Sequence, residues 1–228
     1  MYRVNHIFYS LQGEGYNTGR PAVFVRFAGC NMRCPFCDTE FDSYREMTGE
    51  DIVQAVSGMT PAAETLPMVV LTGGEPTLQV DEALIDLLHR QGYWVAMESN
   101  GTRPAPKNLD WLTVSPKGMP PPSPPHRGGE PTPDPSPREG RVPDEIKLVF
   151  TSEEALEQQI THLFSSDEIL LRAPHPPYGG DWGGLFLQPC DTGDPVQNEA
   201  IMRSCVHYIK QHPQWRLSLQ THKLIGIE

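Results

Sequence analysis

The sequence predicts an α/β protein built on a parallel sheet, and three observations lead to this fold class. Short apolar runs such as Met68-Val69-Val70-Leu71 are typical of parallel strands that are buried on both faces. Stretches with the apolar periodicity of helices lie between these runs. Polar motifs follow directly after several runs, and the carboxyl ends of parallel strands meet at one edge of a sheet, where ligands bind.

In the first half of the chain, strands are expected at 22–27, 68–71, 93–97 and 111–114. Residues 8–20 are rich in glycine and are expected to be irregular. A helix is expected over 48–59 because Thr48 and Asp51 can form a capping box at its start. A second helix is expected over 81–92, from an aspartate cap to a terminating glycine.

In the second half, strands are expected at 146–150, 168–172, 185–188 and 215–219. Helices are expected over 152–164 and after Asp194-Pro195, a cap followed by proline at the first helical position. Residues 118–143 are rich in proline and glycine and nearly free of apolar side chains, so they cannot offset the entropy of ordering. We therefore expect a single domain over 1–228 with a mobile insertion at about 118–143, or a functional lid there as the alternative.

Composition excludes several classes of protein. The chain has 228 residues, 38% of them hydrophobic, and a net charge of −11, which argues against non-specific binding to nucleic acid. No apolar run approaches the roughly 18 residues that would predict a membrane-spanning helix. The N-terminal residues lack the segments of a signal peptide, and five cysteines, three of them clustered, fit a reducing compartment. We expect a cytoplasmic protein that binds neither membrane nor nucleic acid.

Three cysteines form the strongest motif. Cys30, Cys34 and Cys37 are spaced C-x3-C-x2-C directly after the strand predicted over 22–27. Thiolates favour zinc, copper(I) or iron–sulfur clusters, and the fourth cysteine that a four-thiolate cluster site usually has is missing nearby. Three thiolates from one loop would hold a cubane cluster and leave its fourth iron open to a substrate.

Zinc is the alternative at this point. Structural zinc sites use paired C-x2-C or histidine elements, and the one such pair here is Cys34 with Cys37. Cys190 follows a Gln-Pro dipeptide, and Cys205 lies in a helical pattern where a small buried hydrophobic side chain is expected. The loop therefore favours an iron–sulfur cluster, with a zinc-binding interaction module as the second interpretation.

Other polar motifs follow the ends of the predicted strands, and all are expected at the same mouth of the sheet. They are Gly73-Gly74-Glu75, Glu98-Ser99, Ser115-Pro116-Lys117, Gln188 and Gln220-Thr221-His222. Arg26 ends the strand before the cysteines and could bind a carboxylate in a two-pronged fashion; an ordinary ion pair at a strand end is its alternative.

Short motifs along nearly the whole chain outside 118–143 share one resemblance. They are Leu11-Gln12-Gly13-Glu14-Gly15, Arg26-Phe27-Ala28-Gly29-Cys30, Cys37-Asp38-Thr39, Thr72-Gly73-Gly74-Glu75-Pro76, Glu98-Ser99-Asn100-Gly101-Thr102, Val114-Ser115-Pro116-Lys117, Gln188-Pro189 and Gln220-Thr221-His222-Lys223. The cysteine spacing resembles the radical S-adenosylmethionine superfamily. Together the motifs resemble the family of 7-carboxy-7-deazaguanine synthases, enzymes of the pathway to 7-deazapurines such as queuosine.

The resemblance implies a modified, incomplete (β/α) barrel with parallel strands and outer helices, commonly a homodimer. It implies a lyase that converts 6-carboxy-5,6,7,8-tetrahydropterin to 7-carboxy-7-deazaguanine with loss of ammonia. A [4Fe-4S] cluster, S-adenosylmethionine and Mg²⁺ are the implied cofactors, with a flavodoxin or ferredoxin as reductant. A different radical enzyme, such as a glycyl-radical activase, would share the cysteine loop and remains open.

The resemblance also implies roles for individual residues. Cys30, Cys34 and Cys37 would hold the cluster, and Thr39 would bind Mg²⁺, although a capping hydroxyl is its alternative. The implied contacts of S-adenosylmethionine are Gly74, Ser99, Ser115, Pro116, Lys117 and Gln188. The implied contacts of the pterin are Leu11, Gln12, Gly13, Arg26, Thr72 and Glu228, the last through its α-carboxylate at the end of an extended tail. Glu14 and His222 are catalytic candidates without assigned roles, and a structural histidine is nearly as good an interpretation of His222.

Overall fold

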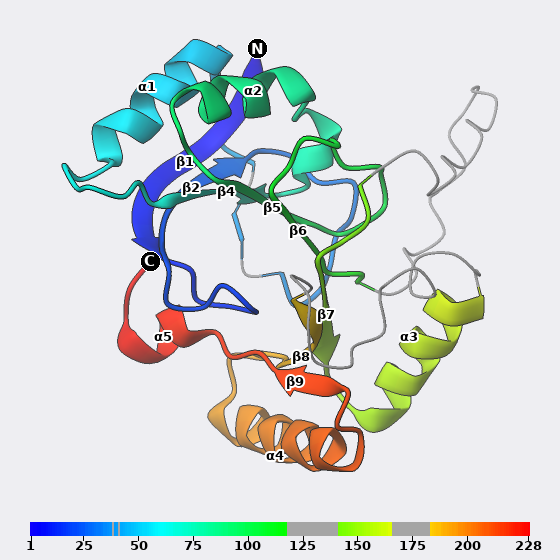
Figure 1. The fold of residues 1–228 in the computed structure, drawn as a ribbon. Helices are drawn as coiled ribbons and strands as arrows, with labels where there is room; N and C mark the ends of the chain where they lie inside the picture. Colours follow the sequence, from blue (N-terminus) through cyan, green and yellow to red (C-terminus); the bar gives the residue numbers. More distant parts are fainter. Residues whose placement is uncertain (38, 41, 118–140, 166–182) are drawn as a thin grey trace.

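The computed structural model describes residues 1–37, 39–40, 42–117, 141–165 and 183–228. These residues form one sheet of nine strands in the spatial order β3-β1-β2-β4-β5-β6-β7-β8-β9 (Figure 1). The strands are β1 (Tyr2–Leu11), β2 (Pro21–Phe27), β3 (Arg45–Met47), β4 (Met68–Gly73), β5 (Val95–Ser99), β6 (Trp111–Val114), β7 (Glu145–Phe150), β8 (Gly184–Pro189) and β9 (Trp215–Leu217).

The sheet is mostly parallel, as predicted. Strand β2 and the strands from β4 to β9 all run parallel to one another. Strand β1 pairs antiparallel with both β2 and β3. The sheet curls into an open barrel with helices on its outer side (Figure 1). The incomplete barrel is therefore confirmed, while the antiparallel edge of β1 and β3 was not predicted.

Strand β1 corrects one prediction. The sequence predicts an irregular segment over 8–20, but residues 8–11 continue β1. Phe8 stacks on Phe24 of β2 with ring centroids 4.9 Å apart, and Leu11 lies opposite Pro21 in the register. Aromatic pairs across strands stabilise a sheet, so the irregular segment begins only after this pairing ends.

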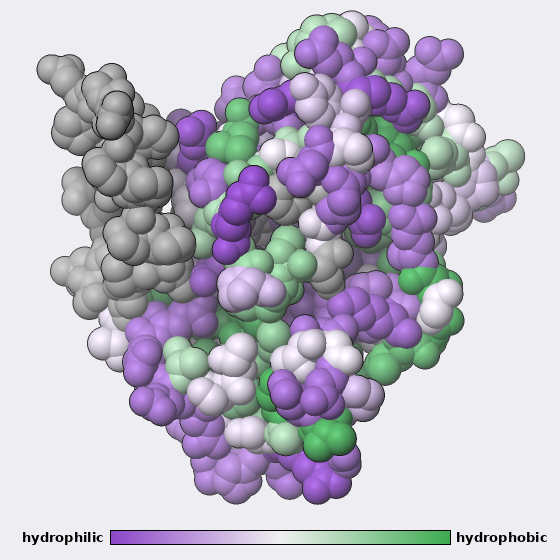
Figure 2. All heavy atoms as spheres, turned by 180° about the vertical axis from the view of Figure 1, so that it is seen from behind, coloured by the Kyte–Doolittle hydropathy of each residue, from purple (hydrophilic) through white to green (hydrophobic). Residues whose placement is uncertain are grey.

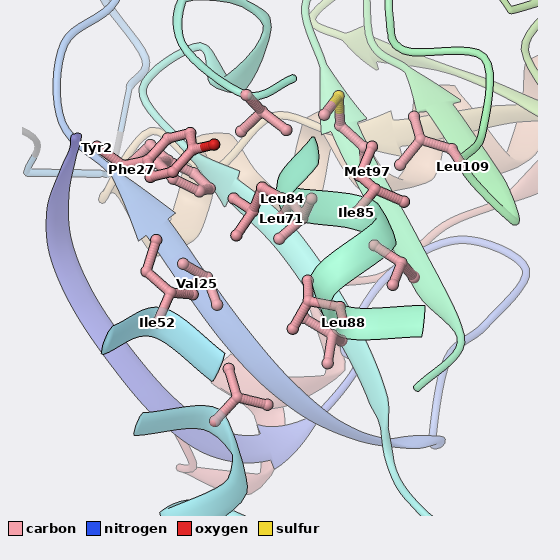
Figure 3. Packing of buried hydrophobic residues seen from close by; sticks show 14 of the residues in the cluster. Tyr2, Val25, Phe27, Ile52, Leu71, Leu84, Ile85, Leu88, Met97 and Leu109 are labelled. Carbon is pink, nitrogen blue, oxygen red and sulfur yellow. The ribbon is translucent and has the colours of Figure 1, made fainter. Parts of the chain in front are cut away.

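Two helices pack on the outer side of the first half of the sheet, α1 (Gly49–Met59) and α2 (Glu82–Arg90). Thr48 and Asp51 form the predicted capping box, and Asp81 caps α2 by accepting a hydrogen bond from the Leu84 amide. Each buried aliphatic side chain of such a core contributes about 1.5–3 kcal/mol. Figure 3 shows this core, which includes Val25, Phe27, Ile52, Leu71, Leu84, Ile85, Leu88 and Met97.

A second core lies between β7, β8 and β9 and the helices α3 (Glu153–Ser165) and α4 (Pro195–Gln211). Asp194 caps α4 and Pro195 takes the first helical position, as predicted. Cys205 is fully buried in this core, in the predicted role of a small hydrophobic side chain. Its members are Ile146, Leu148, Phe150, Leu156, Leu187, Cys205, Tyr208 and Trp215.

Two predictions fall on residues that the structure does not describe. The strand expected at 168–172 lies outside the described residues. The insertion expected at about 118–143 also lies outside them, apart from residues 141–143.

The inner face of the sheet changes character along the strands. At the amino ends it is aromatic: Tyr16 stacks on Trp111 with ring centroids 5.1 Å apart, and Trp94 lies 6.2 Å from Trp111. Tyr16 belongs to the β1–β2 connection, residues 12–20, and this connection therefore reaches across the inside of the barrel. At the carboxyl ends polar side chains take the same face, as the next section describes.

The C-terminal segment corrects the last predicted element. Strand β9 ends at Leu217, and α5 (Thr221–Ile225) takes the place of the expected extended tail. The Thr221 amide donates to the carbonyl of Gly13, 3.0 Å away. The segment after β9 therefore leads back to the end of β1, and the C-terminus lies beside it (Figure 1).

Among the described residues, no helix is long and apolar enough to cross a membrane. On the face seen in Figure 2, hydrophilic residues predominate and hydrophobic residues occur in small groups.

Candidate active site

The carboxyl ends of the parallel strands carry the polar side chains of the inner face. Side chains alternate along a strand, so the residues after buried Leu71 and Met97, which are Thr72 and Glu98, point inward. In β7, Lys147 lies between Ile146 and Leu148 of the outer core in the same way. The sequence prediction of a polar mouth is therefore confirmed by the packing.

The cysteine loop follows β2 and is anchored to neighbouring loops. The Asn100 side chain donates to that of Asn31 at 3.0 Å, and Asn31 donates to Thr102 at 2.7 Å. The Cys37 amide donates to the Cys34 carbonyl at 3.1 Å, which turns the loop back on itself. All three cysteines line one cavity of about 210 Å³, the cluster cavity.

Gly74 is fixed by the close approach of two loops. Its amide donates to Phe27 and the Glu75 amide donates to Gly29, both at 2.9 Å. A Cβ on Gly74 would lie 2.0 Å from the Gly29 carbonyl oxygen and 3.2 Å from the Cys30 amide nitrogen. Only glycine allows this approach, which leaves the backbone of Gly74 exposed to the cluster cavity beside the cysteines.

Glu75 organises the same wall, a role that the sequence did not predict. Its carboxylate is fully buried and accepts hydrogen bonds from Thr77, the Ser99 hydroxyl at 2.9 Å and the Asn100 amide at 2.7 Å. Buried carboxylates require such donors. The Gly-Gly-Glu-Pro motif was the signal, because an acidic residue followed by proline after a buried strand can cap the turn it starts.

The residues predicted to contact S-adenosylmethionine meet in the cluster cavity, with one exception. Gly74, Ser99, Ser115, Lys117 and Gln188 line it, and the Lys117 ammonium donates to the Ser115 hydroxyl at 2.8 Å. Burial and the nearby Lys147 lower the pKa of Lys117. Pro116 does not line the cavity; its carbonyl accepts a hydrogen bond from Gln159.

The three thiols of the loop provide ligands for a metal cluster. Burial raises the pKa of Cys30 and of Cys34, so a metal is needed to hold them as thiolates. Thiols that line one cavity can each ligate a different iron of a cluster. Cys190 also lines this cavity, which the sequence did not predict.

A second cavity of about 280 Å³, the barrel cavity, adjoins the first. Every residue that the sequence assigned to the pterin lines it, together with both catalytic candidates and the unpredicted aromatic pair of Phe8 and Phe24. The lining residues from those predictions are Leu11, Gln12, Gly13, Glu14, Arg26, Thr72, His222 and Glu228. The two cavities share Glu14, Thr39, Thr72, Gly73, Glu98 and Gln220.

Arg26 and Glu228 lie at the outer end of the barrel cavity. The Arg26 guanidinium lies 4.7 Å from the centre of the Phe8 ring and 3.7 Å from the Glu228 side chain. Glu228 also pairs with His6 at 2.9 Å, and its main-chain oxygen accepts a hydrogen bond from Ser10. The side-chain pairs are half-exposed and therefore weak, which leaves Arg26 available to a bound carboxylate.

A buried lysine and two half-buried carboxylates lie where the two cavities meet. The Lys147 ammonium donates to Glu14 and lies 4.0 Å from Glu98, which accepts a hydrogen bond from Gln12 at 2.7 Å. Burial opposes the ionisation of Glu14, but the Lys147 charge and the hydrogen bonds from Lys147 and Gln220 together outweigh it and lower the pKa of Glu14. The sequence missed Lys147; its signal was a lysine inside an otherwise apolar strand.

Glu145 and Gly15 hold the β1–β2 connection against β7. Glu145 is 2% exposed and accepts a hydrogen bond from the Tyr16 amide at 2.9 Å. Burial raises the pKa of Glu145 to about 7, although Lys147 works in the opposite direction. Gly15 has a φ of 66°, and a Cβ there would lie 2.1 Å from the Glu145 carboxylate. Gly15, the second glycine of the Gly-Glu-Gly motif, is therefore needed for packing.

Comparisons with known proteins agree with this site. Residues 24–120 match the family model of the Radical SAM superfamily. The chain is 43% identical to the 7-carboxy-7-deazaguanine synthase of Bacteroides thetaiotaomicron, over 100% of this chain and 99% of the relative. It is 39% identical to the enzyme of that name from Bordetella pertussis, over 99% of both chains.

The structure also resembles a solved one. The crystal structure of QueE from Escherichia coli superposes with a TM-score of 0.69 at 28% sequence identity, covering 96% of this chain and 93% of that one. The relatives align along their full length and not only around the cysteine loop. The chain therefore belongs to the 7-carboxy-7-deazaguanine synthase family of the radical S-adenosylmethionine superfamily.

Proposed function

We propose that this protein is a lyase that converts 6-carboxy-5,6,7,8-tetrahydropterin to 7-carboxy-7-deazaguanine with loss of ammonia, a step in the biosynthesis of 7-deazapurines such as queuosine. The observation that supports this most strongly is the pairing of the two cavities. Three cysteines line one of them, the polar motifs of the family line the other, and a shared wall joins them. Full-length similarity to synthases of this name adds to it.

The proposed roles in the cluster cavity follow the donors present. Cys30, Cys34 and Cys37 would hold a [4Fe-4S] cluster, which with S-adenosylmethionine supplies the one-electron chemistry that removes a substrate hydrogen. The remaining residues bind and orient S-adenosylmethionine. The contacts that we propose are the Gly74 backbone, Ser99, Ser115, Lys117 and Gln188.

The barrel cavity would hold the pterin. Arg26 is proposed to bind the carboxylate of the substrate by charge-assisted hydrogen bonds, and Phe8 and Phe24 offer flat apolar surface beside it. The remaining proposed contacts are Leu11, Gln12, Gly13, Thr72 and Glu228. Glu14 and His222, at the same cavity, are proposed to act on the ring.

Further parts of the proposal rest on family resemblance. Thr39 would contribute a hydroxyl to Mg²⁺, which prefers oxygen ligands and shares them with substrate; its position between the two cavities supports this. We also propose a homodimer in the cytoplasm, reduced by a flavodoxin or ferredoxin.

The test is turnover by reconstituted protein. Purified protein is loaded with iron and sulfide without oxygen, given S-adenosylmethionine and a reductant, and incubated with 6-carboxy-5,6,7,8-tetrahydropterin. Mass spectrometry should find 7-carboxy-7-deazaguanine, and metal analysis should find iron and sulfide in place of zinc. A loaded cluster with cleavage of S-adenosylmethionine but no such product would point to a different radical enzyme, and bound zinc without iron would point to an interaction module.

A further inference from the structure

Lys147 is a buried charge at the centre of the site that none of the proposed binding roles uses. It lies in β7, is 4% exposed, and projects from the inner face of the sheet into the cluster cavity. Its ammonium donates to a Glu14 carboxylate oxygen and lies 4.0 Å from a Glu98 carboxylate oxygen. A buried ammonium is stable only when it is paired, and here two carboxylates from two different segments surround it.

The remaining oxygens of the two carboxylates also have donors. Glu14 accepts from the side-chain amides of Gln220 at 3.0 Å and Gln188 at 3.2 Å. Glu98 accepts from Gln12 at 2.7 Å. An ionised carboxylate only accepts hydrogen bonds, whereas a protonated one must donate one. Every neighbour here is a donor, so the arrangement suits two ionised carboxylates around one ammonium.

The network lies where the two cavities meet. Glu14 and Glu98 line both the cluster cavity and the barrel cavity. Lys147 reaches them from β7, while Glu14 comes from the β1–β2 connection and Glu98 from the end of β5. One ammonium therefore fixes two groups that come from different segments of the chain, and both groups line the two cavities where they meet.

We propose that Lys147 is a positioning residue, whose ammonium keeps Glu14 ionised and holds both Glu14 and Glu98 as hydrogen-bond acceptors at the wall between the two cavities. The proposal rests on the proposed function, because it gives these carboxylates a place beside the reacting ring. Lys147 acts through its two partners and does not itself contact the pterin.

Loss of the ammonium would change the state of its partners. Two carboxylates would then share a half-buried wall without a cation between them, and burial would raise the pKa of Glu14 in place of the present lowering. A protonated Glu14 would point its own O–H donor toward side-chain amides that also donate. Other titratable groups lie near this network and remain in place in the variant; they are Lys117, Glu145 and His222.

The first test uses the apoprotein, so it needs neither cluster nor turnover. Urea unfolding of wild type and Lys147→Met is compared at about pH 5 and about pH 8, on either side of the neutral range in which a buried carboxyl would titrate. In wild type the pKa of Glu14 is lowered, so its contribution to stability is present above its ordinary value of 4.5 and is lost only as pH falls below it. In the variant the pKa of Glu14 is expected to be raised, so the free energy of unfolding falls as pH rises. The difference in free energy of unfolding between wild type and variant must therefore widen from pH 5 to pH 8.

A second variant protects this test against simple misfolding. Adding Glu14→Gln to Lys147→Met removes the stranded carboxylate, so the double variant should unfold at higher urea than Lys147→Met at pH 8, although Glu14→Gln alone destabilises wild type. If Lys147→Met does not fold, folding of the double variant supports the proposal. The proposal would be overturned if wild type and Lys147→Met differed in stability by the same amount at both pH values. It would also be overturned if the double variant were no more stable than Lys147→Met at pH 8.

The second test uses reconstituted enzyme and a pH profile. In Lys147→Met, kcat/KM should gain an acid limb that rises roughly tenfold per pH unit up to the raised carboxyl pKa, while Lys210→Met, an exposed lysine of α4, keeps the wild-type profile. A uniform loss at all pH values would mean that Lys147 only packs. Wild-type protein without product would refute the proposed function instead, and the apoprotein unfolding data would still decide the charge role.

Discussion

The cluster cavity and the barrel cavity are neighbours with different chemistry. The first is lined by soft thiols, a bare glycine backbone and two lysines, which suits a metal cluster and a charged cofactor. The second is lined by Phe8, Phe24, Arg26 and amide groups, which suits a flat polar ring with a carboxylate. Their shared wall is charged and half-buried. The difference supports the proposal that two ligands bind side by side, one on each side of this wall.

The cysteines provide the largest expected effect. Replacing Cys34 by Ala should abolish both cluster assembly and turnover, because three thiolates are the minimum for the site. Absorption of the reconstituted protein and product formation are the measurements.

Cys190→Ala is the matched control for that experiment. Cys190 lines the same cavity but comes from the end of β8 and not from the cysteine loop, and its thiol lies 3.8 Å from the Asp191 carbonyl. This variant should keep cluster and turnover. A Cys34→Ala enzyme that remains active with an intact cluster would refute the assignment of the loop.

Thr39 tests the shared wall and should have an intermediate effect. Thr39→Ala should lower kcat by roughly tenfold and weaken the response to added Mg²⁺, since losses of about that size follow when a metal site loses one supporting group. The cluster spectrum should not change, because a hydroxyl binds the hard ion and not iron.

Thr60→Ala serves as its control, since Thr60 caps the far end of α1 on the outer side of the sheet. This control should keep wild-type kinetics. If Thr39→Ala responds to Mg²⁺ as wild type does, then Thr39 has only a structural role.

A substitution of Asp191, which lines the cluster cavity and is half-exposed, should have the smallest effect. Asp191 pairs with Lys223 at 2.9 Å and accepts a hydrogen bond from the Gly193 amide; the bond from Lys223 is the main reason that the pKa of Asp191 is lowered to about 2. Because the pair is solvent-exposed, Asp191→Asn should lower the free energy of unfolding by less than about 1 kcal/mol at neutral pH.

The pH dependence gives this prediction its sign. A lowered carboxyl pKa stabilises the fold above the ordinary value of 3.8, and that contribution is lost as pH falls toward about 2. The difference between Asp191→Asn and wild type in urea unfolding should therefore shrink below pH 3.8. A difference that stays constant would mean that the charge of Asp191 contributes nothing to stability.

Local sequence signals predicted most of the fold. The capping box of Thr48 and Asp51, the Asp194-Pro195 start and the short apolar strands depend on neighbours in the chain, and all were found where expected within the described residues. The strand over residues 8–11 was missed because its stability comes from pairing Phe8 with Phe24, a contact between distant residues. The helix α5 was missed because its first residue is held by Gly13, far away in the sequence.

The candidate site shows the same limit. Strand ends place Thr72, Glu98 and Gln188 at one mouth, and this follows from the direction of the strands alone. The pairing of Lys147 with Glu14 does not follow from strand direction, because 133 positions separate the two residues and only the folded barrel brings them together. A lysine within a buried strand is nevertheless a signal, since it must find a partner. The sequence could identify the group but not its partner.

The most direct test of two side-by-side sites is to titrate both ligands into reconstituted Arg26→Ala and Lys117→Ala proteins by anaerobic calorimetry. Arg26 lines the barrel cavity and Lys117 the cluster cavity. Arg26→Ala should bind the carboxypterin roughly tenfold to a hundredfold more weakly, the effect of one charge-assisted hydrogen-bonding group, and bind S-adenosylmethionine as wild type does. Lys117→Ala should show the reverse. If each variant weakens both ligands equally, the two cavities do not hold separate ligands.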